Sequence, residues 1–333
     1  MNTYEHITQN RWRSILLVIL FPVTFAITAG LIMWLSADLW APQKEAYTLV
    51  CDLYGNQCDY LSRGQMIGVM VLRWVPVLWL VAMGWIFISY FVGDSLILSS
   101  TKAVKVTRDN QPELYRLVEN LAITRGLPTP TIYVIDDDTL NAFATGRDPQ
   151  HASIAFTRGI LQRLERVELE GVAAHELAHI ENRDIRLMLL TVAGISFFTL
   201  IGEICLRIGL FSRSSNGKND GAVRLLFLLA GFGFLVYGYV IAPLIRLAVS
   251  RQREYQADAT AALTTRNPLG LANALRKISG HCQTKSLQEM HSVAAMCIAN
   301  PLTSVGLFDM LSGMLSTHPP IEERIRRLEE MSR

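Results

Sequence analysis

Four long apolar segments constrain what this chain of 333 residues can fold into. They cover residues 15–35, 66–92, 187–206 and 225–245. Each reaches or approaches the roughly 20 apolar residues that a helix needs to cross a bilayer. Hydrophobic residues make up 50% of the chain and charged residues only 18%, which is more apolar than an ordinary soluble protein. The sequence therefore predicts a mostly α-helical membrane protein with about four transmembrane helices in a lipid bilayer.

The charges that flank these segments predict an orientation. Arg11 and Arg13 precede the first segment, and Lys102 and Lys105 follow the second, whereas the loop 36–65 between them is mainly acidic. Because basic flanks are typical of the cytoplasmic side, we expect the N-terminus and the polar region after the second segment to be cytoplasmic. The loop between the third and fourth segments is basic, so those two segments either form a hairpin that does not fully cross or break this rule.

Loop 36–65 also contains Cys51 and Cys58. A disulfide between them is expected if the loop faces an oxidising compartment, and two free thiols are the alternative. No pair among the five cysteines has CxxC spacing, so a cysteine-ligated metal site is not indicated. A net charge of +2, without a basic aromatic patch, gives no reason to expect a nucleic-acid partner.

The polar stretches predict a soluble α+β domain that a membrane hairpin divides into two halves. Short β-rich runs at 131–136 and 152–157, with a possible strand at 141–146 between them, indicate a small sheet in its first half. The expected organisation is an N-terminal membrane region at 1–98, a first half of the domain at 99–186, a membrane hairpin at 187–245 and a second half at 246–333.

The motif HELAH at residues 175–179 carries the clearest chemistry. Residues four apart share one face of a helix, so His175 and His179 can bind one metal ion while Glu176 stands beside its open position. A catalytic zinc takes three protein ligands and leaves the fourth position to water. The motif therefore predicts a Zn²⁺-dependent hydrolase in which Glu176 is the general base.

The third ligand must come from elsewhere in the chain. The stretch SRQREYQADA at 250–259 places Glu254 and Asp258 four residues apart on one helical face. Glu254 is expected to bind the metal, and Asp258 to accept a hydrogen bond from the outer nitrogen of a ligand histidine. The alternative is a solvated acidic face paired with neighbouring arginines. His281 and His291 are further ligand candidates, although polar surface positions explain them more simply.

The C-terminal region supplies two further candidates. His318 and Arg324 are expected to stabilise the oxyanion that forms when a peptide bond is attacked. The competing interpretation is an amphipathic helix that begins after Pro319 and Pro320, with His318 near its cap.

Four ordered motifs resemble the HtpX-type membrane zinc metalloproteases, which belong to the gluzincins and are distant relatives of the CAAX prenyl endopeptidases. They are NAFATG at 141–146, HELAH at 175–179, REYQADA at 253–259 and STHPPIEERIRRL at 316–328. The resemblance covers the chain from about residue 100 to the C-terminus. It implies a zincin-like domain with one Zn²⁺ per chain, in a bacterial inner-membrane endopeptidase. Its catalytic domain would be cytoplasmic, and its polypeptide substrates would be misfolded or damaged membrane proteins in quality control and stress response.

The resemblance also implies roles for individual residues. It supports His175, His179 and Glu254 as zinc ligands, Glu176 as the base and Asp258 as the partner of a ligand histidine. It further implies that an edge strand beside the cleft pairs with the extended substrate, through Asn141, Ala142, Phe143 and Ala144. This chain departs from the family pattern in its longer loop 36–65, which carries the two cysteines.

Two other classes of protein are disfavoured. An intramembrane protease would place HExxH at hydrocarbon depth, but the surrounding helix carries Glu168, Glu170, Glu181, Arg183 and Asp184. A non-catalytic scaffold or chaperone that retains a structural zinc site is the alternative function. Structural zinc sites usually fill all four positions, often with cysteines, and such a site would have no use for Glu176.

Overall fold

The computed structural model describes residues 3–35, 49–51, 58–60, 63–211, 220–238, 242–279 and 319–332. The chain divides into two compact units, each described below by itself. One unit comprises Met1–Ile15, Ile88–Ile195 and Ile241–Arg333, and the other comprises Leu16–Phe87 and Ser196–Val240.

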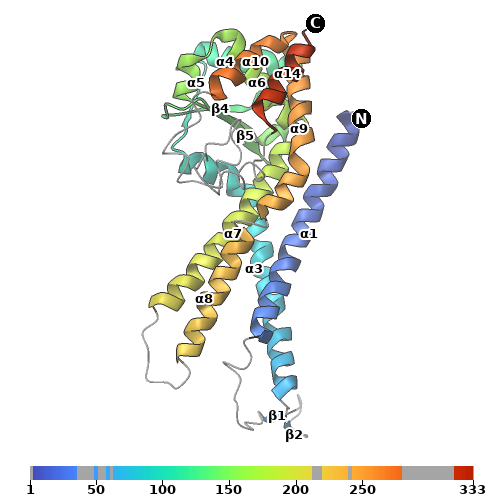
Figure 1. Ribbon diagram of the computed structural model, residues 1–333, viewed down its shortest axis with the longest axis vertical. Helices are drawn as coiled ribbons and strands as arrows, with labels where there is room; N and C mark the ends of the chain where they lie inside the picture. Colours follow the sequence, from blue (N-terminus) through green and yellow to red (C-terminus); the bar gives the residue numbers. More distant parts are fainter. Residues whose placement is uncertain are drawn as a thin grey trace. The chain divides into compact units, whose positions relative to one another are not determined.

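The second unit is a group of apolar helices with aromatic side chains at its centre. Phe25 packs edge-on against Phe197, with ring centroids 4.8 Å apart, and both belong to a buried cluster with Phe198 and Phe234. The helices that contribute to it are α1 (Thr3–Leu35), α3 (Arg63–Ser100), α7 (Asp184–Phe211) and α8 (Asp220–Val236) (Figure 1).

Two helical stretches among the described residues are long and apolar enough to cross a membrane, Leu72–Ser100 and Asp184–Phe211. Ser14–Gly30 and Val223–Val236 are apolar but shorter. Helices therefore lie on each of the four predicted segments, as expected of a membrane protein, while the number of crossings stays a prediction.

Two short strands, β1 (Leu49–Cys51) and β2 (Cys58–Tyr60), pair in the loop that the sequence predicts to be outside. The antiparallel register places Cys51 opposite Cys58. Directly opposed residues of such a pair have Cα atoms about 4.5–5.5 Å apart, which is within the range that a disulfide spans. The register is compatible with the disulfide, which stays a prediction.

The first unit contains a small mixed sheet, in agreement with the α+β expectation, and the three predicted strands form β4 (Thr131–Ile135), β5 (Ala142–Gly146) and β6 (Ala152–Thr157). Side chains of β6 alternate between two apolar clusters, because Ile154 and Phe156 enter one and Ala155 enters the other. Both faces of the sheet are therefore covered, and β5 is left at one edge. The strand order is β3 (Val104–Lys105), β4, β6 and β5, with only β4 and β6 parallel.

Helix α6 (Arg166–Glu181) is the central helix of this unit, and its residues from Gly171 to Ile180 are buried. It contacts strand β5 and helices from both predicted halves of the soluble domain. These helices are α4 (Pro112–Thr124), α9 (Ala242–Thr265) and α10 (Pro268–Ser279), and α14 (Ile321–Glu330) packs on α9 and α10.

The close packing of α10 on α6 depends on a glycine. A Cβ atom built at Gly171 would lie 2.7 Å from the backbone nitrogen of Leu271, which is too close for any side chain. Gly171 therefore lets two helical backbones approach directly above the HELAH segment.

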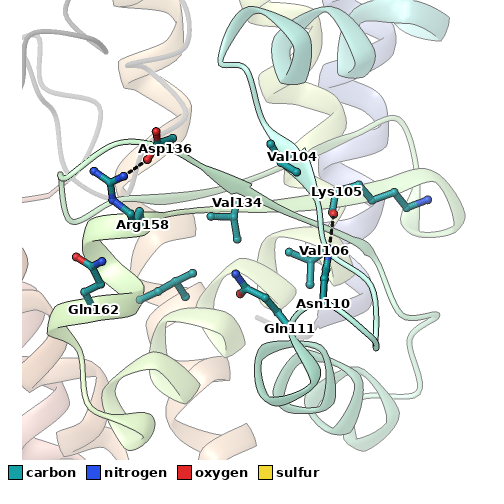
Figure 2. A pocket seen from close by; sticks show the side chains of 10 residues that line it. Val104, Lys105, Val106, Asn110, Gln111, Val134, Asp136, Arg158 and Gln162 are labelled. Atoms are coloured by element: carbon teal, nitrogen blue, oxygen red, sulfur yellow. Dashed lines mark hydrogen bonds and ion pairs between the residues drawn. The ribbon is translucent and has the colours of Figure 1, made fainter.

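A cavity of about 380 Å³ lies at the edge of the sheet opposite β5 (Figure 2). Val104 and Lys105 of β3 line it together with Gln111, which precedes α4. An ion pair between Arg158 and Asp136 closes one side. None of the predicted site residues lines this cavity.

Candidate metal centre

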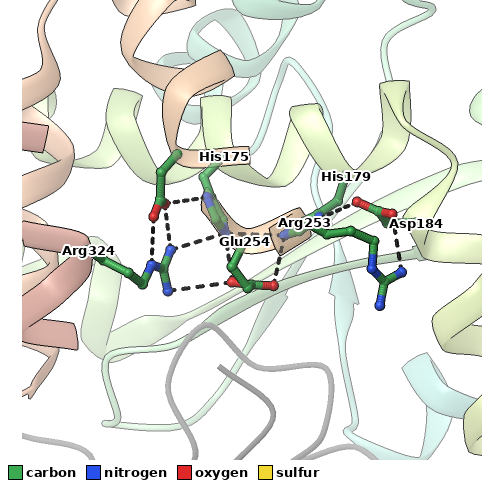
Figure 3. Close-up of polar contacts among 7 residues, drawn as sticks. His175, His179, Asp184, Arg253, Glu254 and Arg324 are labelled. Atoms are coloured by element: carbon green, nitrogen blue, oxygen red, sulfur yellow. Dashed lines mark hydrogen bonds and ion pairs between the residues drawn. The ribbon is translucent and has the colours of Figure 1, made fainter. Parts of the chain in front are cut away.

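Three side chains from two helices converge at the middle of α6 (Figure 3). His175 and His179 project from successive turns of α6, and Glu254 reaches them from α9. The two Nε2 atoms lie 3.2 Å apart. Glu254 Oε2 is 3.7 Å from His175 Nε2, and Glu254 Oε1 is 3.6 Å from His179 Nε2. The three residues thus offer one donor atom each within 4.8 Å of one another, as a shared metal ion requires.

These separations fit a first-row divalent metal. Ligand atoms at 2.0–2.2 Å from a tetrahedral zinc ion are on the order of 3.3 Å from each other. The observed 3.2 Å between the two histidine nitrogens matches this value, and the contacts of Glu254 exceed it by only a few tenths of an ångström. His175, His179 and Glu254 can therefore hold such an ion with small adjustments.

An aspartate carboxylate lies next to the outer nitrogen of each histidine. His175 Nδ1 lies 3.0 Å from Asp258 Oδ1, and His179 Nδ1 lies 3.0 Å from Asp184 Oδ2. When Nδ1–H donates to a carboxylate, the lone pair of Nε2 is left for a metal. Burial also lowers the pKa of His175, which favours its neutral, ligating form. Both imidazoles therefore present the correct nitrogen to the centre of the site.

Asp258 is itself held by a buried arginine of α14. Arg324 Nε donates to Asp258 Oδ2 at 2.8 Å, and Nη2 donates to Oδ1 at 2.7 Å, which makes the contact bidentate. Burial alone would raise the pKa of Asp258, but the charge and hydrogen bonds of Arg324 lower it to about 2. Arg324 Nη1 is also 3.5 Å from Glu254 Oε2. This arginine thus lies behind the donor set and keeps Asp258 ionised.

The charges at the site also call for a divalent cation. Four carboxylates and two guanidinium groups are buried at the site. The carboxylates belong to Glu176, Asp184, Glu254 and Asp258, and the guanidinium groups belong to Arg253 and Arg324. With neutral histidines, two negative charges are in excess, and uncompensated buried charge is costly. A bound divalent ion would restore neutrality.

The excess of negative charge raises the pKa of two groups at the site. Burial, assisted by the charge of Glu254, raises the pKa of Glu176 to about 7. Burial would lower the pKa of His179, but its hydrogen bond to Asp184 and the charge of Glu254 raise it to about 9. The same negative charge would attract a metal ion.

Glu176 lies between the donor set and the edge strand. Its side chain is only 3% exposed, and the backbone N–H of Ala144 donates a hydrogen bond to its carboxylate. The neighbouring Ala142 N–H is bonded to the side-chain oxygen of Asn141 at 2.9 Å. The predicted strand NAFATG therefore forms β5, next to the predicted base, and Phe143 points into the apolar cluster on the other face.

Some of the predicted site residues lie where the sequence suggested, and others do not. Glu254 and Asp258 are buried in the site, so the alternative of a solvated acidic face is wrong. Arg324 binds Asp258, whereas the sequence suggested a contact with the oxyanion. His318, His281 and His291 lie outside the described residues.

Sequence reasoning assigned no role at the site to Asp184 and Arg253. Asp184 follows His179 by five positions, and Arg253 directly precedes Glu254. Their closeness in the sequence to two predicted ligands was the feature that could have indicated a role at the site. Arg253 resembled a surface partner for an acidic face, but it donates to Asp184 Oδ1 at 3.2 Å inside the protein.

The fold and the site define a membrane metalloprotease, and comparison with known proteins gives the family. Residues 108–332 match the family described as Peptidase family M48, to which the chain belongs. A Protease HtpX homolog of Bacteroides fragilis (strain YCH46) is 39% identical over 327 residues, covering 97% of both chains. A Protease HtpX homolog of Tropheryma whipplei (strain Twist) is 41% identical over 285 residues, covering 86% of this chain and 92% of the relative.

Among solved structures, the chain is similar to S. mikatae Ste24p, with a TM-score of 0.48 and 19% identity. The match covers 92% of this chain and 63% of the length of Ste24p. The relatives confirm the resemblance to HtpX-type metalloproteases that the four motifs indicated.

Proposed function

We propose that this protein is a zinc-dependent endopeptidase of the bacterial inner membrane that cleaves misfolded or damaged membrane proteins at the cytoplasmic face. The observation that carries the proposal is the convergence of His175, His179 and Glu254 beside the carboxylate of Glu176. The basic flanks of the first two apolar segments support the cytoplasmic position of the site.

In this proposal, His175, His179 and Glu254 hold the metal. When bound, zinc supplies a water molecule activated for attack at neutral pH and polarises the scissile carbonyl. Glu176 takes the proton from the attacking water and delivers it to the leaving amine.

The substrate is proposed to bind in extended form along β5. Ala142 and Ala144 belong to a strand that is paired on one side only, by β6. An extended peptide can add to such an edge through the backbone carbonyls of Ala142 and Ala144, and through their N–H groups where it displaces the side chains of Asn141 and Glu176. Because the Ala144 N–H also holds Glu176, a peptide on this edge would bring its carbonyl groups close to the base.

Arg324 and Asp258 are proposed to keep His175 in its ligating orientation. The bidentate contact uses Nε and Nη2 of Arg324, so those donors face Asp258 and not a substrate. The role of oxyanion donor is left to His318, which stays a prediction.

The proposal is tested with the full chain in lipid vesicles. Wild type and Glu176→Gln are each reconstituted with a stably folded membrane protein or with a destabilised variant of it, with and without a zinc chelator. We expect wild type to cleave the destabilised substrate preferentially, and both the chelator and the substitution to stop cleavage. Equal cleavage of the two substrates would contradict the quality-control role, and cleavage that survives chelation would contradict the metal mechanism.

A further inference from the structure

Asp184 is the first residue of α7, and it is turned back toward the preceding helix. Its side chain is 1% exposed. The turn is made by Arg183, whose φ of 58° is in the left-handed region that residues with a side chain rarely adopt. Such a conformation is strained, and it persists where the surrounding structure holds it in place. Here it places the Asp184 carboxylate against His179.

The two oxygens of Asp184 have different partners. Oδ2 lies 3.0 Å from His179 Nδ1, and Oδ1 accepts from Arg253 at 3.2 Å. Arg253 is 9% exposed and directly precedes Glu254 on α9. A series of contacts therefore links the predicted ligand His179, through Asp184, to Arg253. Arg253 is the neighbour of Glu254, which is another predicted ligand.

Resting on the proposed function, we infer that Asp184 and Arg253 are a positioning pair that fixes His179 for metal binding and joins the two halves of the split site. The other ligand histidine has the same arrangement, because Asp258 contacts Nδ1 of His175 and Arg324 binds Asp258. Asp184 holds the tautomer and ring orientation of His179, and Arg253 compensates the charge of Asp184 in its buried position. Neither residue touches the substrate in this scheme.

The inference is tested on the full chain in detergent with Asp184→Asn, Arg253→Met and Arg253→Lys. Gln252→Met is the matched control, because Gln252 is the exposed neighbour of Arg253 on the same helix. Zinc affinity is measured by chelator competition, and the Co²⁺-substituted protein is measured by its visible absorption spectrum. Loss of a residue that orients a ligand histidine typically weakens metal binding 10–100-fold.

We expect Asp184→Asn and Arg253→Met to weaken zinc binding by about 10–100-fold and to alter the Co²⁺ spectrum. Arg253→Lys should restore part of the affinity, and Gln252→Met should match wild type. A purely structural role would lower the unfolding temperature without changing the spectrum, and that result would overturn the inference. Unchanged affinity in both Asp184→Asn and Arg253→Met would overturn it as well. If wild type itself binds no zinc, the proposed function fails instead.

Discussion

Arg324 on α14 makes a bidentate contact with Asp258 on α9, at 2.8 and 2.7 Å, inside the protein. The arginine side chain is 0% exposed. Because Asp258 contacts His175 and Arg324 Nη1 lies 3.5 Å from Glu254 Oε2, the last helix of the described chain directly contacts the predicted metal site. The C-terminal helix therefore packs against the predicted metal site.

Replacing Arg324 should strongly destabilise the fold. Arg324→Met leaves Asp258 ionised and without its buried partner, which we expect to destabilise the first unit by about 3–5 kcal/mol. Arg324→Lys should recover only part of this, because a lysine cannot make the planar bidentate contact. Urea unfolding followed by near-UV circular dichroism measures the effect. Arg326→Met is the control, since Arg326 lies on the same helix with 58% of its side chain exposed. Equal stability of the Arg324 and Arg326 variants would contradict the prediction.

Glu254 should be required for metal retention. Glu254→Ala removes one of the three donors, so the purified protein should lose most of its zinc. Metal content per chain is measured by atomic emission, with Gln252→Ala on the same helix as the control. Unchanged zinc in Glu254→Ala would remove this residue from the ligand set.

Gly171 should not tolerate a side chain. The backbone nitrogen of Leu271 lies 2.7 Å from the position of a Cβ, so Gly171→Ala must push α10 away from α6. Forced overpacking of this kind typically costs about 1–3 kcal/mol. Gly221→Ala is the matched control, because nothing lies within 4 Å of a Cβ at that position. A lower Tm for Gly221→Ala than for Gly171→Ala would contradict this packing.

Helix α14 should contribute a pH-dependent stabilisation. Hydrogen bonds from Arg326 and then Arg327 lower the pKa of Glu323 from 4.5 to about 2. A folded-state pKa below the unfolded value means that the stabilisation is complete above about pH 4.5 and is lost as the pH falls through about 2. The difference in Tm between wild type and Glu323→Gln should therefore be largest near neutrality and vanish in acid. Glu322→Gln is the control, and a difference that grows on acidification would reverse the assigned sign.

Local spacing was sufficient to predict the candidate ligands within each motif, but the convergence of the two motifs depends on the tertiary packing of α9 on α6. Helical periodicity alone places His175, Glu176 and His179 on neighbouring faces, and it places Asp258 one turn after Glu254. The position of residues 141–146 between two β-rich runs likewise predicted a strand there, which is β5. The paired arrangement of β5 with β6 at a sheet edge depends on long-range contacts that periodicity does not encode.

The contacts around the donor set could not be predicted in the same way. Arg253 and Arg324 are charged residues in polar helices, a composition typical of solvated surfaces. Only the tertiary structure shows that each is buried against an aspartate that faces a histidine. The sequence offered Arg324 as one of two candidates to stabilise the oxyanion, a role that stays a prediction, and it did not indicate the contact with Asp258.

The most direct test compares wild type with Glu176→Gln, both purified as full chains in detergent, for zinc content and for cleavage of an unfolded protein. The account predicts one zinc per chain in both proteins, because Glu176 is not a ligand, and a loss of at least about 100-fold in cleavage by the variant. Equal rates of cleavage by two zinc-loaded proteins would contradict the assignment of Glu176 as the general base.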